Sequence, residues 1–151
     1  MNYTFFGKIW RRMPARARWR LVRMSQPTFT VSAGAVVLNR KGEVLLLHHI
    51  LRPGSGWGIP GGFLDRGEQP EDAIRRELFE ETGVELRDVR MLEAHTAVRH
   101  IEFVYAARTD DDPRVLSREI TELGWFGPDS LPAGLPQAHR KLIESVWRSE
   151  I

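Results

Sequence analysis

Three glutamates lie close together near the end of one predicted helix. A helix is predicted over 70–82, because a proline at its first position and Gly83 just after its end suit the two helix termini. Glu77, Glu80 and Glu81 fall in its last turns, where the helix dipole is negative and acidic side chains are unfavourable. At about 100° per residue, the three share one face of the helix. A cation bound at this face would offset the cost of the cluster.

The neighbouring residues fit the same chemistry. Carboxylate oxygens are hard ligands that suit Mg²⁺, which binds through a few carboxylates together with water and substrate phosphates. Glu68 precedes the helix as a further acid, and Arg76 is placed to orient a carboxylate by a charge-assisted hydrogen bond. The pair Gly61 and Gly62 allows the backbone to approach a metal or a phosphate closely. These residues predict a metal site.

The remaining elements that position this site are predicted from hydrophobic patterns. Strands are expected over 29–38, 44–47, 91–98, 101–108 and 123–126, and a last helix over 137–147. A hairpin turn is expected over 39–42, and the segment 53–56 is expected to be a mobile loop. This pattern predicts one α/β (α+β) domain with helices packed on a mixed sheet.

Composition and charge divide the chain into two parts. Its 151 residues are enough for one domain, no apolar run is long enough to span a bilayer, and the absence of cysteine fits a reducing compartment, so a cytoplasmic location is expected. Residues 1–27 carry seven of the 22 basic residues and no acid, whereas residues 28–151 carry 15 basic and 20 acidic residues. We expect a basic arm over 1–27 and the folded domain over 28–151. Because the basic charge belongs to the arm, nucleic acid is not the expected partner of the domain.

The arm is amphipathic and has four competing interpretations. Its apolar residues form two stripes separated by Pro14: Phe5, Phe6, Ile9, Trp10 and Met13, then Trp19, Leu21, Val22 and Met24. The arm packs on the domain or on a second subunit, or it contacts an acidic membrane surface, or it is a cleaved targeting peptide, or it contacts phosphate groups of a nucleic acid or substrate.

The acidic stretch resembles the Nudix box, whose pattern is G-x5-E-x7-R-E-U-x-E-E-x-G-U, with U an aliphatic residue. All nine fixed positions are filled across 23 residues. They are Gly62, Glu68, Arg76, Glu77, Leu78, Glu80, Glu81, Gly83 and Val84. The resemblance covers roughly residues 29–147 and implies the Nudix fold, an α/β/α sandwich with a mixed sheet. It also implies a pyrophosphohydrolase that depends on Mg²⁺ (or Mn²⁺) and acts on a nucleoside diphosphate linked to another moiety.

The resemblance also implies roles for particular residues. Glu77, Glu80 and Glu81 would hold one to three divalent ions, with a backbone carbonyl of Gly61 or Gly62 as a further ligand. The general base is left open between Glu77 on the helix and a glutamate of a later loop. In that loop Glu119 is preferred over Glu122, because its spacing to Trp125 resembles that of the late glutamate of the family. Glu119 is also a candidate metal ligand.

The substrate is less well defined by the sequence. Trp57 and Phe63 are candidates to stack on a base, and both also suit packing. Arg52, with His48 and His49 nearby, is a candidate phosphate contact. Markers of individual subfamilies downstream of the box do not match this chain. The expected partner is therefore a small-molecule nucleotide, of the nucleoside triphosphate or nucleotide-sugar type.

Two classes of function are carried forward. The first is a hydrolase, and the second is a nucleotide-sensing or regulatory module on a Nudix scaffold that does not turn its ligand over. Loss of box glutamates is the usual sign of the second class, and this chain has lost none. Homodimers are common in the family, so a homodimer is a further expectation of the resemblance.

Overall fold

In the described part of the chain, one mixed sheet of seven strands carries helices on both faces. The computed structural model describes the backbone of residues 3–150 and the side chains of residues 7–149. The elements in order are α1 (Tyr3–Arg12), α2 (Ala15–Ser25), β1 (Thr30–Leu38), β2 (Val44–His49), β3 (Trp57–Gly58), β4 (Gly61–Phe63), α3 (Pro70–Thr82), β5 (Arg87–Ala97), β6 (His100–Arg108), β7 (Ile120–Phe126) and α4 (Gln137–Glu150). The α/β/α sandwich with a mixed sheet is confirmed.

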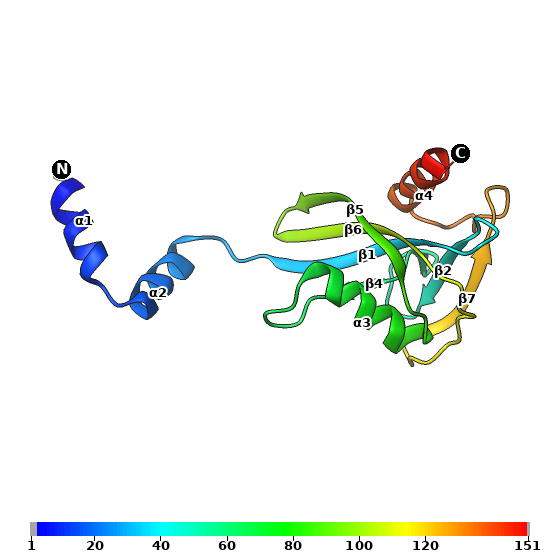
Figure 1. Cartoon of the computed structure of the whole chain (residues 1–151), viewed down its shortest axis with the longest axis horizontal. Coiled ribbons are helices and arrows are strands. Elements are labelled where there is room, and N and C mark those ends of the chain that lie inside the picture. The colour runs from blue at the N-terminus through cyan, green and yellow to red at the C-terminus, as the bar shows by residue number, and fades with distance from the viewer. Residues whose placement is uncertain (1–2, 151) are drawn as a thin grey trace.

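Side-chain alternation along the central strands explains the layers. Ala35 and Val37 of β1 lie in one core cluster, together with the buried face of α3. Val36 and Leu38 point to the other face, into the cluster that contains the apolar residues of α4. Strand β2 divides its leucines in the same way. Both faces of β1 and β2 are therefore covered, and Figure 1 shows α3 and α4 on opposite sides of the sheet.

The strand order places the short strand β4 beside the central strand β1. The main path runs β3-β2-β1-β6-β5, with β1 and β6 parallel and the other pairs antiparallel. Strand β4 pairs with β1, so that Gly61 lies opposite Gly34, and β7 pairs with β2. Strand β4 leads towards α3, so the sheet holds the glycine pair beside the acidic helix.

Helix α3 has the predicted bounds, and its ends explain why. Pro70 occupies the first turn with Glu71 and Asp72, which the positive end of the helix dipole favours. Gly83 ends the helix in the left-handed conformation, with a φ of 73°, and its N–H donates to the carbonyl of Phe79 at 2.9 Å. The acidic cluster is thus held on a helix whose ends are both well defined.

Several boundaries differ from those expected from the sequence. The strands β3 and β4 were missing from the prediction, because two or three residues rich in glycine carry no periodic pattern. Strand β5 begins at Arg87 and β7 at Ile120, earlier than expected. The pairing of β5 with β6 is interrupted by register shifts between Arg87 and Glu93, which break the alternation used to predict it.

The basic arm forms two helices that lie apart from the sheet in Figure 1. Pro14 separates them, as the sequence predicts, and occupies the position before the first residue of α2. Several large apolar side chains of the arm are exposed, including Trp19 at 68% and Met24 at 85%. Phe5 and Phe6 of the predicted stripe lie outside the described side chains. Within the described residues, no helix is both long and apolar enough to cross a membrane.

Candidate active site

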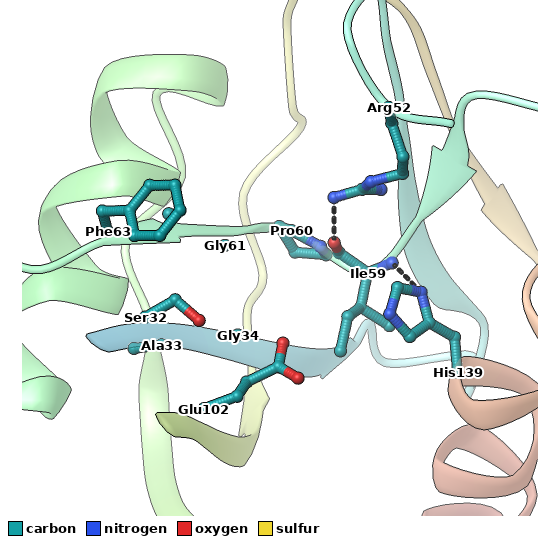
Figure 2. A pocket seen from close by; sticks show the side chains of 11 residues that line it. Ser32, Ala33, Gly34, Arg52, Ile59, Pro60, Gly61, Phe63, Glu102 and His139 are labelled. Carbon is teal, nitrogen blue, oxygen red and sulfur yellow. Dashed lines mark hydrogen bonds between the residues drawn. The ribbon is translucent and has the colours of Figure 1, made fainter. Parts of the chain in front are cut away.

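Two adjoining hollows open beside β4 and share Arg52, Gly61, Gly62 and Phe63. The larger one, the acidic cleft, has a volume of about 800 Å³. Its lining includes His49, Asp65, Arg76, Glu77, Glu81 and Glu119. The smaller one, the side pocket of Figure 2, has a volume of about 240 Å³. Its lining includes Ser32, Gly34, Ile59, Glu102 and His139. A ligand can therefore extend from the cleft into the side pocket.

The glycine pair is required by close contacts on both sides of β4. A Cβ on Gly61 would collide with the carbonyl of Ala33 and lie 2.8 Å from the Cα of Gly34. A Cβ on Gly62 would collide with the carboxylate of Glu77. The backbone of β4 thus lies directly between a core strand and an acidic side chain, as the sequence prediction of close approach requires.

Arg76 donates hydrogen bonds to several acidic side chains at the acidic cleft and beside it. Its Nε and Nη2 donate to the two oxygens of Glu68 at 2.8 and 3.0 Å, a bidentate pair. Its Nη1 donates to Glu77 at 2.9 Å and, less closely, to Glu80 at 3.4 Å, while Nη2 also reaches the carbonyl of Phe63 at 3.2 Å. One guanidinium therefore connects the loop before α3, the helix and β4.

Glu68 serves this network rather than the cleft itself. The hydrogen bonds from Arg76, followed by the N–H of Asp65 at 2.7 Å, lower the pKa of Glu68 to about 2. The acids around Arg76 in turn raise its own pKa above the ordinary value. Glu68 is absent from the residues that line the cleft. Both of its carboxylate oxygens accept hydrogen bonds from Arg76 instead.

Glu81 is the most deeply buried acid of the site. Its side chain is 8% exposed, and its Oε2 is buried without a hydrogen-bond partner in the described part of the chain. Burial, followed by repulsion from Glu77, raises the pKa of Glu81 to about 7, although Arg52 acts in the opposite direction. A buried, unpaired carboxylate is costly. This arrangement fits a bound cation, which would supply the missing partner.

Arg52 lies between the two hollows. Its Nη2 donates to the carbonyl of Ile59 at 3.1 Å, whereas its Nη1 is buried without a partner among the described residues. A Cβ on Gly58 would collide with this guanidinium, so glycine there makes room for it. Burial lowers the pKa of Arg52, and the charges of Glu81 and Glu102 raise it. A cation with a free N–H beside both hollows suits an anionic ligand.

His49 contacts Glu81 without forming an ion pair at neutral pH. Its Nδ1 lies 4.0 Å from Glu81 Oε1. Burial, followed by the positive charge of Arg52, lowers the pKa of His49 to about 4. His49 is therefore neutral at pH 7 and leaves the charge of Glu81 uncompensated.

The donor set fits a divalent ion that keeps several waters. Glu77, Glu81 and Glu119 line one cleft with the glycine pair, and carboxylate oxygens suit a hard cation. Among the described residues, however, no three His, Cys, Asp or Glu side chains form a group that could hold a metal by themselves. Glu80 does not line the cleft, and its side chain is 60% exposed beside Arg76. The expected role of Glu80 as a ligand is thus not supported by its position.

The two aromatic residues that are predicted to stack on a base lie in different places. Phe63 is 65% exposed and lines both hollows. Trp57 does not line either one, because its ring packs edge-on against Phe126 at a centroid distance of 5.2 Å and belongs to the core cluster under α4. Of the two uses predicted for Trp57, stacking on a base and packing, its position in the structure favours packing. His48 is also turned away, since its Nδ1 lies 2.6 Å from Thr121 Oγ1.

The later loop brings Glu119 to the acidic cleft. The carbonyl of Glu119 accepts a hydrogen bond from the N–H of Ile50 at 2.9 Å, which fixes the backbone of this loop beside the end of β2. The negative charge of Glu119 contributes to the raised pKa of Glu81. Glu122 lies on β7, opposite His48, and does not line the cleft. Of the two predicted candidates, only Glu119 lines the acidic cleft.

Sequence reasoning missed Glu102 and His139. Glu102 is an acid between Ile101 and Phe103 of β6, and its interruption of an apolar run was the available signal. His139 lies in the first turn of α4, whose helical spacing predicts only a packing role. Figure 2 shows both side chains at the side pocket, with Ile59 between His139 and Arg52.

This fold and site define a hydrolase-like α/β/α domain with a carboxylate-lined cleft. Residues 28–146 match the family model of the NUDIX domain, so the chain belongs to the Nudix family. The predicted resemblance is confirmed, and the chain is a Nudix hydrolase, a family whose members generally use divalent metal ions.

Three relatives illustrate the range of this similarity. The MutT NUDIX hydrolase from Burkholderia pseudomallei is 35% identical, with a TM-score of 0.69 over 80% of this chain and 98% of that one. The NAD-capped RNA hydrolase NudC of Vibrio parahaemolyticus is 30% identical over 74% of this chain, which spans only 45% of that protein. The NUDIX domain of Shewanella oneidensis NrtR, solved with ADP ribose, shares the fold at a TM-score of 0.76 and 21% identity, covering 92% of this chain and 100% of that one.

Proposed function

We propose that the acidic cleft hydrolyses a nucleoside diphosphate linked to another moiety, of the nucleoside triphosphate or nucleotide-sugar type, with Mg²⁺ or Mn²⁺. The observation that carries this proposal is the buried, unpaired carboxylate of Glu81 beside Glu77 and the unpaired Nη1 of Arg52. Glu81 Oε2 and Arg52 Nη1 lack hydrogen-bond partners among the described residues, and such a pair in one cleft suits a ligand that combines a divalent ion with phosphates.

Each residue has a proposed part in binding. Glu77 and Glu81, with a backbone carbonyl of Gly61 or Gly62, would hold the divalent ion, which when bound neutralises phosphate charge and lowers the pKa of a water molecule. Arg52 binds a phosphate oxygen through Nη1. Arg76 keeps Glu77 in place and does not need to touch the substrate.

Glu119 acts as the general base in this proposal. It lines the cleft from a loop rather than from the helix, so it can receive a proton from the attacking water while Glu77 and Glu81 hold their positions. The water attacks phosphorus in line with the leaving group, and the P–O bond to that group breaks. The water oxygen stays on the attacked phosphorus, the bridging oxygen leaves with the other phosphate fragment, and the protons of the water pass to Glu119 and then to the leaving phosphate or to solvent.

A substrate panel tests the reaction directly. Purified full-length protein is incubated with nucleoside triphosphates, nucleotide sugars and ADP-ribose, with Mg²⁺, with Mn²⁺ or with a chelator, and the products are identified by mass spectrometry in ¹⁸O-labelled water. We expect release of a nucleoside monophosphate from at least one substrate, dependent on the metal, with one ¹⁸O in a phosphate. Tight binding without release would instead identify a nucleotide-sensing module.

Replacing the proposed base gives a narrower prediction. Glu119→Gln is expected to lower kcat by about 10²- to 10⁴-fold with a smaller change in KM, because the amide keeps the shape of the side chain but cannot accept the proton of the attacking water. Glu122→Gln is the matched control and should stay near wild type, since Glu122 lies outside the cleft. Near-wild-type kcat for Glu119→Gln would assign the base to Glu77.

The arm carries a second candidate function, attachment to an anionic membrane surface. The specific observation is the exposure of Trp10, Trp19 and Met24 on helices that hold seven basic residues and no acid. Exposed aromatic and apolar side chains next to arginines suit the interface of an anionic bilayer. Packing on a second subunit is the competing use of the same surface.

Vesicle binding distinguishes these uses. Full-length protein should sediment with vesicles that contain anionic lipid and much less with zwitterionic ones, and added salt should weaken the binding. Met24→Ala is expected to reduce the bound fraction, whereas Met91→Ala, an exposed methionine on β5, should not. Equal binding to both kinds of vesicle, or a dimer that needs Met24 by light scattering, would contradict the membrane proposal.

A further inference from the structure

The side pocket has the position to hold the nucleoside of the substrate. It adjoins the acidic cleft through Arg52 and the residues of β4, so a ligand with its phosphates in the cleft can place its other end there. The ring of Phe63 is 65% exposed at the boundary of the two hollows, where a planar base can stack on it. The polar groups of the pocket then determine which base fits.

Glu102 supplies an acceptor that protein groups leave largely unused. It is the carboxylate among the residues lining the side pocket and enters from β6, opposite Ser32 of β1. Its Oε2 lies 3.2 Å from His95 Nε2, while its Oε1 has no hydrogen-bond partner in the described part of the chain. A Cβ on Gly34 would lie 3.6 Å from Oε1, so the missing side chain at this position leaves space for a ligand.

His139 supplies a donor on the same pocket. Its Nδ1 accepts a hydrogen bond from the N–H of Ile59 at 3.3 Å. Burial, followed by the charge of Arg52, lowers the pKa of His139 to about 4, so the ring is neutral at pH 7. Because Nδ1 accepts, the ring proton is on Nε2, which has no partner among the described residues. The pocket therefore presents an N–H donor and a carboxylate acceptor.

The edges of the four bases differ in how well they suit these groups. Guanine presents a carbonyl acceptor followed by two adjacent donors, its ring N–H and its 2-amino group. In adenine and cytosine a ring nitrogen lone pair lies beside the amino group, and it would repel a carboxylate. Uracil has one ring N–H between two carbonyl oxygens. A carboxylate with a neighbouring N–H donor is thus most complementary to guanine.

We propose that the side pocket selects guanine nucleotides, with Glu102 accepting from the ring N–H and 2-amino group and His139 donating to the carbonyl oxygen. This inference rests on the proposed function, because it assumes that the phosphates occupy the acidic cleft. Glu102 and His139 are specificity-determining residues here and take no part in the hydrolysis.

The test compares bases, sugars and variants in one matrix. We would measure kcat/KM for GTP, dGTP, ITP and ATP with wild type, Glu102→Gln and Glu93→Gln, the last being a matched control on β5 that lies near His95 but outside the side pocket. Wild type should prefer GTP over ATP by about 10-fold or more, with ITP between them because it lacks the 2-amino group. Glu102→Gln should remove most of this preference by lowering kcat/KM for both GTP and dGTP while leaving ATP nearly unchanged, and Glu93→Gln should keep the preference.

Three results would overturn the inference. The first is an equal loss of kcat/KM for GTP and ATP in Glu102→Gln. The second is a loss of kcat/KM for GTP with dGTP unaffected, which would place the ribose hydroxyls on Glu102. The third is a wild-type protein without base preference. Calorimetric titration with GMP and AMP separates this inference from the proposed reaction. If wild type binds GMP more tightly than AMP and Glu102→Gln abolishes this difference, the pocket assignment is supported even if no nucleotide is hydrolysed. Hydrolysis without base preference would support the proposed reaction and contradict the selection of guanine.

Discussion

Glu81→Gln is expected to lower turnover by about 10³-fold or more and, in the absence of metal, to make the protein more stable above pH 7. The loss of turnover follows because the amide cannot supply the negative charge that a divalent ion needs in the acidic cleft. The gain in stability follows from the burial that raises the pKa of Glu81 to about 7. Turnover falls and stability rises for the same reason, because the substitution removes the buried negative charge of Glu81.

The pH dependence of the free energy of unfolding follows from that shift. A carboxyl whose pKa is raised from 4.5 to about 7 by folding binds a proton more tightly in the folded state. The metal-free protein therefore loses stability as pH rises from about 4.5 to about 7 and loses no more from this group above pH 7. The full effect is on the order of 3 kcal/mol as an upper limit, since one pKa unit corresponds to about 1.4 kcal/mol.

Urea unfolding with a chelator at pH 5 and pH 8 measures this effect. At pH 5 the free energy of unfolding of Glu81→Gln should be close to that of wild type. At pH 8 the variant should be the more stable protein. Added Mg²⁺ should stabilise wild type and leave the variant nearly unchanged. Glu85→Gln, an exposed acid just beyond the same helix, is the control and should show neither effect. Wild-type activity in Glu81→Gln would refute the metal assignment.

Arg76→Ala is expected to lower kcat/KM by about 10- to 100-fold, although Arg76 needs no contact with the substrate. Removal of the guanidinium takes hydrogen bonds from Glu68 and Glu77 together. Glu77 then loses its orientation at the cleft, and partners that orient metal ligands typically have effects of this size. Apparent metal affinity, measured as the Mg²⁺ concentration for half-maximal activity, should weaken in parallel.

Arg76→Ala is also expected to change how the free energy of unfolding depends on pH in acid. Arg76 is the largest cause of the low pKa of Glu68, about 2, so the pair stabilises the folded state above pH 4.5 and loses that contribution as pH falls towards 2. The stability difference between wild type and Arg76→Ala should thus shrink over that range. Arg75→Ala is the control, because Arg75 pairs with Glu71 and the carbonyl of Leu86 outside the cleft. An equal loss of metal affinity in both variants would refute the specific role of Arg76.

Local rules explain how much of the fold could be predicted. The bounds of α3 were predicted in full, because Pro70 and Gly83 define its ends through their own backbone preferences. Strand β1 was found from its β-branched and small residues, and β2 was found because residues covered on both faces give a continuous apolar run. Strand β4 was missed because it is held by its neighbours: Gly61 has no propensity for a strand and pairs with Gly34 only in the assembled sheet.

The site was predictable where its residues are close in sequence. Glu77 and Glu81 are four residues apart on α3, so helical spacing alone places them together at the cleft. Glu102 and His139 reach the side pocket from β6 and α4, and no local pattern shows that these elements meet. Trp57 shows the converse problem, since an aromatic residue near a site is equally suited to the core, and packing against Phe126 decided its position.

The glycines beside the site have a consequence for redesign of this enzyme. At Gly58, Gly61 and Gly62 the space of a side chain is already filled by Arg52, by the backbone of β1 and by Glu77. Side chains introduced at these three positions would mostly displace the neighbouring site residues and would seldom create a new substrate preference. Evolvable positions are instead those whose side chains line the side pocket without supporting the cleft. Changes of substrate should therefore arise on β1, β6 and α4, while the β3-to-β4 segment stays fixed.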